Sequence, residues 1–111
     1  MKMKNHLIIS LLILSVGFSQ RLSEVIETYD YGNIKSIKYH KKTRDRIEKV
    51  KFEKYYENGQ KEKEGTYKDG EKNGLWTYWN ENGQMEREET YKDGNIVSYK
   101  RWNEDGSVNN D

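Results

Sequence analysis

The chain contains no cysteine, no proline and no alanine, and it has only two histidines. Without cysteine it can form neither disulfides nor thiolate metal sites, so its stability must come from backbone pairing and the burial of apolar side chains. Alanine, the best helix former, is absent, while tyrosine, tryptophan and the β-branched residues that favour strands are frequent. The composition therefore favours a β structure in one small domain.

A continuous apolar run occurs only near the N-terminus, at residues 7–18, where the sequence reads "LIISLLILSVGF". Two lysines precede it, and Gly17 and Ser19 supply the small residues that flank a cleavage site after Ser19. This order is typical of a secretory signal peptide, and the run is too short to span a bilayer comfortably. We predict that residues 1–19 are a cleaved signal peptide and residues 20–111 an exported domain, either secreted or periplasmic. An uncleaved N-terminal anchor is the alternative.

Charge is distributed unevenly along the rest of the chain, with a net charge of +6 over residues 34–54 and of −5 over residues 55–111. The basic part contains a candidate patch for an anionic ligand, such as an anionic lipid or a cell-wall glycan: Lys41, Lys42, Arg44 and Arg46. Export argues against a nucleic-acid partner, whereas a membrane surface remains a possible partner. The alternative interpretation is a charged hairpin loop that its lysines and arginines keep soluble.

Short motifs recur along the chain at a period of 23 or 24 residues. "TYKDG" occurs at 66–70 and 90–94, "ENGQ" at 57–60 and 81–84, and "WNENG" at 79–83 returns as "WNEDG" at 102–106. A weaker copy lies earlier, because residues 27–40 match residues 89–102 at eight of fourteen positions. Self-similarity at such a period is the signature of a repeat architecture.

Asn-Gly and Asp-Gly pairs punctuate these units, at 58–59, 69–70, 73–74, 82–83, 93–94 and 105–106. Such pairs are the strongest short-range hairpin signals, because glycine accepts positive φ and asparagine or aspartate tolerates it. We therefore expect an all-β, elongated antiparallel meander of stacked hairpins, with negligible helix after residue 19. The expected strands are 22–29, 33–40, 47–56, 60–67, 75–79, 84–91 and 95–102, with a remnant at 107–109.

Two features of this meander concern the direction of its first strand and the solvation of one of its faces. Segments 22–29 and 84–91 look equivalent, yet a single strand at 47–56 would give them opposite directions. Either residues 41–56 hide two short strands, or the first copy is only locally similar. Alternation puts Met85, Arg87, Glu89 and Tyr91 on one face, which we expect to be mostly solvated. The sheet should be a thin ribbon braced by cross-strand aromatic pairs.

The stretch "YYENGQKEKEGTYKDGEKNGLWTYWNENGQMEREETYKDG" resembles the bacterial variant of the MORN repeat. In that pattern Tyr-x-x-Asn-Gly and Tyr-x-x-Gly turns alternate with Gly-x-Trp strands. The likeness covers residues 54–106, and residues 27–40 more weakly. The resemblance implies hairpins stacked in a curved sheet, and binding of proteins or membranes rather than catalysis. Many bacterial proteins with this repeat are labelled antitoxin components of toxin–antitoxin pairs, although a signal peptide does not fit a cytoplasmic antitoxin.

A second resemblance concerns residues 74–85, "GLWTYWNENGQM", which are similar to a choline-binding cell-wall repeat. In those repeats hairpin aromatics cage a quaternary ammonium group by cation–π attraction. Here "EREETY" follows, with charges where the next aromatic of such a repeat would stand. We rank a choline or glycan binder below the MORN-like interpretation.

The residues needed for catalysis do not form a recognisable set. His6 lies in the predicted signal peptide, and no serine–histidine–carboxylate set assembles around His40. Glu86, Glu88 and Glu89 fit solvated strand positions better than an acid–base pair. The Asp-Gly turns lack the further acidic positions of a calcium loop. We expect no enzymatic activity, no cofactor and no metal.

The most probable role by this reasoning is a binding module for a partner protein. The candidate partner surface consists of Trp76, Tyr78, Tyr99 and Arg101, although these side chains would also brace the sheet. The strand at 95–102 has room for only a stub of a further strand beside it. We therefore expect its outer edge, at Ile96 and Val97, to pair with a partner or with a second copy.

Overall fold

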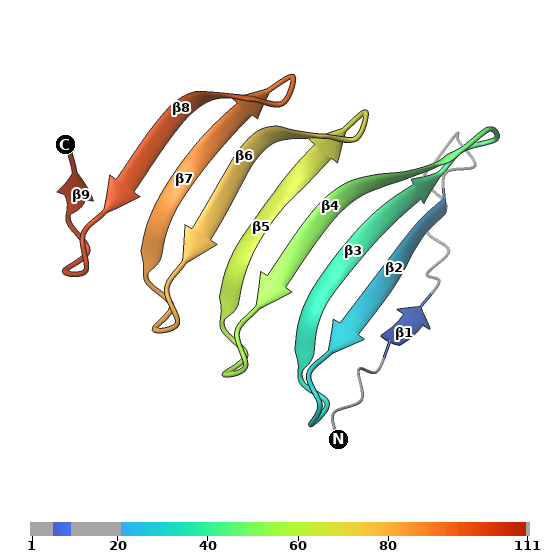
Figure 1. Cartoon of the computed structure of the whole chain (residues 1–111), viewed down its shortest axis with the longest axis horizontal. Coiled ribbons are helices and arrows are strands. Elements are labelled where there is room, and N and C mark those ends of the chain that lie inside the picture. Colours follow the sequence, from blue (N-terminus) through green and yellow to red (C-terminus); the bar gives the residue numbers. More distant parts are fainter. Residues whose placement is uncertain (1–5, 10–20, 111) are drawn as a thin grey trace.

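The computed structural model describes residues 6–9 and 21–110, and the regular structure in them is entirely β (Figure 1). The strands are β1 (His6–Ile9), β2 (Arg21–Thr28), β3 (Ile34–Lys42), β4 (Ile47–Tyr55), β5 (Lys61–Lys68), β6 (Glu71–Trp79), β7 (Met85–Lys92), β8 (Asn95–Trp102) and β9 (Val108–Asn109). Each strand pairs antiparallel with the next, so that one open sheet follows the order of the chain. The predicted all-β meander is confirmed. In the described part of the chain no helix is long and apolar enough to cross a membrane.

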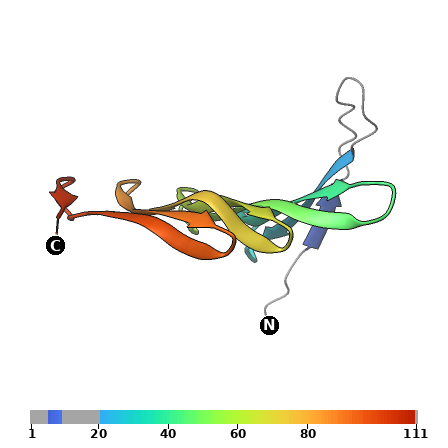
Figure 2. The same cartoon turned by 90° about the horizontal axis from the view of Figure 1, so that it is seen from above.

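The sheet is a single layer, and seen edge-on it is a thin, twisted ribbon (Figure 2). Its accessible surface is 8135 Å², whereas a compact protein of this mass exposes roughly 6,500 Å². Only three apolar side chains among the described residues are buried, namely Ile26, Ile37 and Trp76. Stability therefore rests on the hydrogen-bonded ladders and on cross-strand side-chain contacts rather than on a deep core.

One end of the sheet carries four five-residue turns, at 29–33, 56–60, 80–84 and 103–107. In each turn the first residue donates its N–H to the carbonyl of the fifth, and the glycine donates back to the first. The N–H of Tyr56, for example, lies 2.8 Å from the carbonyl of Gln60. The opposite end has two-residue turns in which Asp69 and Asp93 adopt φ of 52° and 51° before a glycine. Positive φ at both central residues defines the type I′ hairpin turn.

The two kinds of turn decide whether the first copy of the repeat is equivalent to the later one. Residues 47–55 form one strand, so segments 22–29 and 84–91 do run in opposite directions. Residues 29–33 form a five-residue turn, whereas the matching residues 91–95 contain the two-residue turn at Asp93. The first copy is therefore only locally similar, because both kinds of turn need a glycine at the same offset from a tyrosine.

The five-residue turns are tied to one another by side chains one repeat apart. The hydroxyl of Tyr29 donates to the carbonyl of Tyr55 at 2.7 Å, and the hydroxyl of Tyr56 donates to the carbonyl of Trp79 at 2.7 Å. The amide of Asn58 donates to the carbonyl of Glu81 at 2.8 Å. These bonds give a physical reason for the tyrosines that begin the first two five-residue turns, since Tyr29 and Tyr56 each fix their own hairpin against the following one.

The Asn73-Gly74 pair is not a hairpin turn, which corrects the sequence-based expectation. β6 begins at Glu71, four residues before the predicted start, and runs through this pair. Glu64 pairs with Thr77 while Thr66 pairs with Asn73, so three residues of β6 stand opposite Gly65. Gly74, at φ 78°, accommodates this bulge.

A second bulge corrects the expected set of residues on one face. Tyr78 pairs with Arg87 and Trp79 with Met85, which leaves Glu86 as the extra residue of β7. Met85 therefore lies on the opposite face from Arg87, Glu89 and Tyr91, because the bulge shifts the alternation by one residue.

Most of the predicted signal peptide lies outside the described residues. Its residues 6–9 form β1, which pairs with residues 24–27 of β2. Cleavage after Ser19 would remove β1 and leave β2 as an edge strand.

Candidate binding surface

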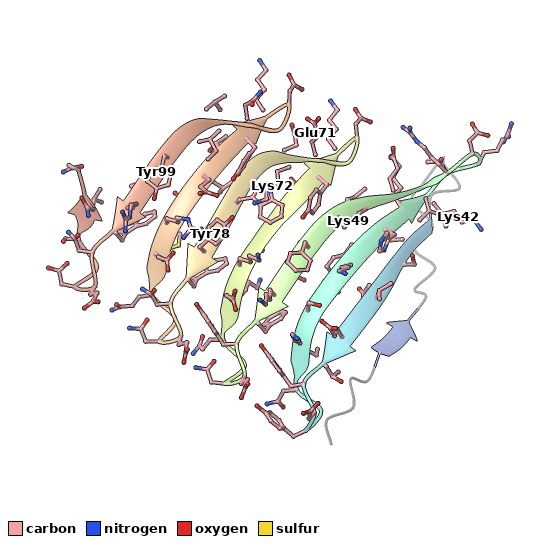
Figure 3. The ribbon with its side chains drawn as sticks, in the orientation of Figure 1. Lys42, Lys49, Glu71, Lys72, Tyr78 and Tyr99 are labelled. Carbon is pink, nitrogen blue, oxygen red and sulfur yellow. The ribbon has the colours of Figure 1, made fainter. Side chains whose placement is uncertain are left out.

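The pairing register assigns the side chains to two faces, because directly paired residues lie on the same side of a sheet. We name these the Trp76 face and the Glu53 face. The Trp76 face contains the row Lys54, Lys63, Tyr78, Arg87 and Arg101, which are paired in turn across β4 to β8. Beside this row lie Phe52, Gly65, Trp76, Glu89 and Tyr99 on the same five strands. A mostly basic row thus lies beside a row that contains three aromatic side chains, and Figure 3 labels Tyr78 of the first row and Tyr99 of the second.

Trp76 is the most deeply buried of the described side chains, with 1% of its surface exposed. Its indole lies where a Cβ of Gly65 would be, and its N–H donates to the carbonyl of Thr66 at 3.0 Å. The ring of Tyr67 meets it edge-on at 5.1 Å between centroids. Trp76 was predicted to be an exposed contact for a partner, and its burial corrects that prediction: it is the structural centre of this face.

The other members of the predicted partner surface do lie on this face. Tyr78 is half-buried, and the guanidinium of Arg87 lies 3.8 Å from its ring centroid. Tyr99 is 52% exposed and stands opposite Glu89, while Arg101 is exposed and stands opposite Arg87. The structure thus brings Tyr78, Tyr99 and Arg101 together as an accessible group at the β7–β8 end of the sheet.

Most cations of the Trp76 face lie against aromatic rings. The distances from charge to ring centroid are 4.1 Å for Lys49 over Tyr67, 4.5 Å for Lys72 over Trp76, 5.1 Å for Lys72 over Tyr91 and 5.7 Å for Lys63 over Phe52. All lie within the range of cation–π attraction. Sequence analysis missed these pairs, although each one joins a basic and an aromatic residue that the register places in neighbouring rows.

Glu89 is the buried acid of the Trp76 face. Its carboxylate accepts a hydrogen bond from the Tyr91 hydroxyl at 2.9 Å and from Nε of Arg87 at 3.3 Å. Burial on its own raises the pKa of the Glu89 carboxyl, but these hydrogen bonds and the charge of Arg87 outweigh it and lower the pKa. Glu89 was expected to be solvated, and its burial corrects that expectation.

On the Glu53 face, the charged groups around Glu53 form hydrogen bonds and ion pairs with one another. Glu53 is buried and accepts a hydrogen bond from the Tyr39 hydroxyl at 2.6 Å, and the Lys61 ammonium lies 3.1 Å away. Lys61 also lies 2.8 Å from Glu64. Burial alone would raise the pKa of the Glu53 carboxyl, but the hydrogen bonds from Tyr39 and Lys61 lower it. Glu53, Glu64, Lys51 and Lys61 thus satisfy one another.

The predicted anionic-ligand patch lies at the β3–β4 connection and the strand end before it. Lys42 and Arg44 are exposed, and Lys41 stands opposite Glu48 in the register. The guanidinium of Arg46 lies 2.6 Å from Glu48 and 3.8 Å from Asp69, which belongs to a different turn. Carboxylates of this and the neighbouring hairpin therefore reduce the positive charge of the patch.

The outer edge of β8 is largely unpaired within the described residues. β9 pairs only with Arg101 and Trp102, so no strand covers residues 95–100 on that side. Ile96 and Val97 are 51% and 61% exposed. The predicted shape of this edge is confirmed, and Val97 is in addition the extra residue of a bulge, because Tyr91 pairs with Ile96 and Thr90 with Ser98.

The described residues contain no group of three or more histidine, aspartate or glutamate side chains placed to hold a metal ion. His40 is half-buried. Burial lowers the pKa of its imidazole, and the nearby Lys49 and Lys38 lower it further.

Fold and surface together define a single-layer repeat sheet with one charged aromatic face and an open edge at β8. Residues 50–69 and 72–93 each match the family described as MORN repeat variant. The two matched segments run from β4 to the β7–β8 turn. Neither a curated protein nor a solved structure matches the chain.

Proposed function

We propose that this protein is an exported, non-enzymatic binding module that engages a partner protein through its repeat sheet. The observation that carries the proposal is the open edge of β8, where residues 95–100 have no strand partner in the described structure. An unpaired edge offers backbone N–H and C=O groups for β-addition, and natural proteins protect such edges when no partner uses them. The MORN repeats support the proposal, because repeats of this type are commonly binding modules.

The edge is only weakly protected. Lys100 and Arg101 supply charge at its end, while Ile96, Val97 and Tyr99 are each more than half exposed. A partner strand that pairs here would cover these apolar side chains and gain backbone hydrogen bonds at the same time. The same edge also serves contact between two copies of the chain.

A charge placed on the edge tests this proposal. Val97→Lys should abolish association, measured as sedimentation of the full chain for self-association and as pull-down for a partner protein. A lysine is preferable to a proline at this position, because the bulge of an edge strand is a place that accommodates proline. Leu75→Lys is the matched control, since Leu75 is 51% exposed but lies on the central strand β6. Equal association of the two variants and the wild type would show that the edge is not the contact.

Export is supported by the predicted signal peptide. Expression of the full chain in a bacterium, followed by N-terminal sequencing of the protein outside the cytoplasm, should find Gln20 as the first residue. Retention of the intact N-terminus would instead favour the uncleaved anchor.

Two other functions predict different observations. An antitoxin or immunity protein would pair tightly with the product of a neighbouring toxin gene. A lipid or glycan binder would be retained on anionic vesicles or cell-wall material in a salt-sensitive way, and retention would fall on neutralising Lys41, Lys42, Arg44 and Arg46. The ion pairs of Arg46 make this patch a weaker candidate than the β8 edge.

A further inference from the structure

On strands β4 to β6, three lysines of the Trp76 face have no acidic partner among the described residues: Lys49, Lys63 and Lys72. They come from the neighbouring strands β4, β5 and β6, and each lies over an aromatic ring. We call them the lysine triad. Two lysines of the Glu53 face, Lys51 and Lys61, instead lie within 4 Å of the Glu53 carboxylate.

The triad is a concentration of uncompensated positive charge. Burial lowers the pKa of the Lys63 ammonium, and the surrounding cations Lys54, Lys72 and Arg87 lower it further against the single carboxylate of Glu62. The ammonium of Lys72 also reaches within 3.4 Å of the Tyr78 hydroxyl, which draws it toward the Lys63 side of the face. An anion that docks here would relieve this repulsion and find ammonium groups already held against rings, with little side-chain entropy left to lose.

We infer that the lysine triad docks an acidic segment of the partner protein, one rich in aspartate and glutamate. This inference rests on the proposed protein-binding function and specifies the chemistry of the partner. Carboxylates match the ammonium groups in charge and in hydrogen bonding. Lys49 lies over the ring of Tyr67 and Lys72 pairs with Tyr67, whereas Lys63 stands four residues earlier on β5, so the three ammonium groups form a triangle that several carboxylates of one acidic segment could contact together.

Other polyanions fit this surface less well. Sugars and nucleobases are commonly held by stacking on open aromatic rings, but here lysines lie over the rings of Phe52, Tyr67, Trp76 and Tyr91. A membrane surface would be favoured by exposed aliphatic side chains around the cations. Leu75 is on the opposite face, and the exposed aliphatic side chains of the Trp76 face, Ile47 and Ile96, are isolated residues on β4 and β8 rather than a continuous apolar surface.

A fluorescent peptide of ten glutamates is a direct probe, with binding to the full chain followed by anisotropy at low and physiological salt. The variant Lys49→Gln, Lys63→Gln, Lys72→Gln should bind at least about tenfold more weakly, since it removes three modest charge contacts that act together. The control is Lys51→Gln, Lys68→Gln, Lys92→Gln, which removes the same charge from the Glu53 face and should stay within about twofold of the wild type. Circular dichroism must show both variants folded.

The outcomes separate the possibilities. An equal loss in both triple variants would show an effect of net charge alone and would overturn the inference. Binding of heparin or of anionic phosphatidylserine vesicles, but not of the glutamate peptide, would overturn it in favour of a glycan or a lipid. Sedimentation of the triad variant measures association through the β8 edge independently of peptide binding. The acidic-segment inference can therefore fail while the proposed edge association holds, and the edge association can fail while the acidic-segment inference holds.

Discussion

Gly65 is the position at which the smallest substitution should do the most damage. It lies in β5 directly beneath the indole of Trp76. A Cβ at Gly65 would lie 2.5 Å from Cγ of Trp76 and closer still to Cδ2 and Cε2, whereas ordinary contacts begin at 3.4 Å. The clash is with a rigid aromatic ring, so Gly65→Ala must displace the indole or separate β5 from β6.

The size of the effect follows from what the displaced ring loses. Overpacking of a fitted site costs about 1–3 kcal/mol. Loss of the bond from the indole N–H to the Thr66 carbonyl adds about 0.5–1.5 kcal/mol. We expect Gly65→Ala to lower the free energy of unfolding by about 3 kcal/mol in all, close to the cost of deleting the ring in Trp76→Ala. In a domain of this size such a loss lowers Tm by roughly 12–24 °C.

A double-mutant cycle on the full chain isolates the cause, with stability measured by urea unfolding followed by circular dichroism. If the clash is responsible, Gly65→Ala should cost little or nothing in a Trp76→Ala background, and the two changes should be strongly non-additive. The same cost in both backgrounds would refute the reasoning. So would a single Gly65→Ala variant within about 0.5 kcal/mol of the wild type.

Two further predictions concern the turns and the buried acid. Tyr56→Phe removes the hydrogen bond to the Trp79 carbonyl and should lower the free energy of unfolding in urea by about 1 kcal/mol. Tyr99→Phe is the control, because the Tyr99 hydroxyl has no hydrogen-bond partner in the described structure, and it should cost nothing measurable. Equal effects would show that the Tyr56 hydroxyl does not help to tie neighbouring turns together. Because the folded pKa of Glu53 lies below its ordinary value of 4.5, its stabilising contribution is complete above that pH and is lost as pH falls through the folded pKa. Tm measured from pH 7 to pH 3 should therefore fall less steeply for Glu53→Gln than for the wild type, and parallel curves would show that Glu53 does not contribute to acid unfolding.

The strands and the kind of fold were predictable from the sequence because the turns are encoded locally. Asp69-Gly70 and Asp93-Gly94 form the type I′ turns that such pairs favour, and the strands between the turns begin and end within a few residues of their predicted limits. Asn73-Gly74 carries the same local signal yet lies inside β6. Only its long-range pairing with β5 and β7 makes it a bulge, and pairing of that kind cannot be read from a dipeptide.

The candidate surface was less predictable, since burial in a single-layer sheet depends on individual neighbours. The sequence predicts that Trp76 is an exposed aromatic side chain on a strand. Its ring can lie flat on the sheet only because the residue beneath it on the adjacent strand is a glycine. Glu89 reads as a solvated acid, and it is buried because Arg87 and Tyr91 hold it. The lysine triad could not be seen because it depends on the register of three strands and on bulges that change which residues share a face.

Comparison of equivalent positions explains why the C-terminal end of the sheet is the exposed one. The repeat of "WNENG" as "WNEDG" is offset by 23 residues and places Tyr99 in the position of Trp76. Trp76 lies between Gly65 on one side and Glu89 on the other, and it is buried. Tyr99 has Glu89 where Trp76 has the glycine, and β9 does not extend far enough to cover it. The same position in the repeat thus yields a structural ring inside the array and a half-exposed ring at its end. On β8 the half-exposed ring of Tyr99 thus lies beside Arg101 and the unpaired backbone of residues 95–100, and a partner strand that paired there would gain both hydrogen bonds and apolar contact.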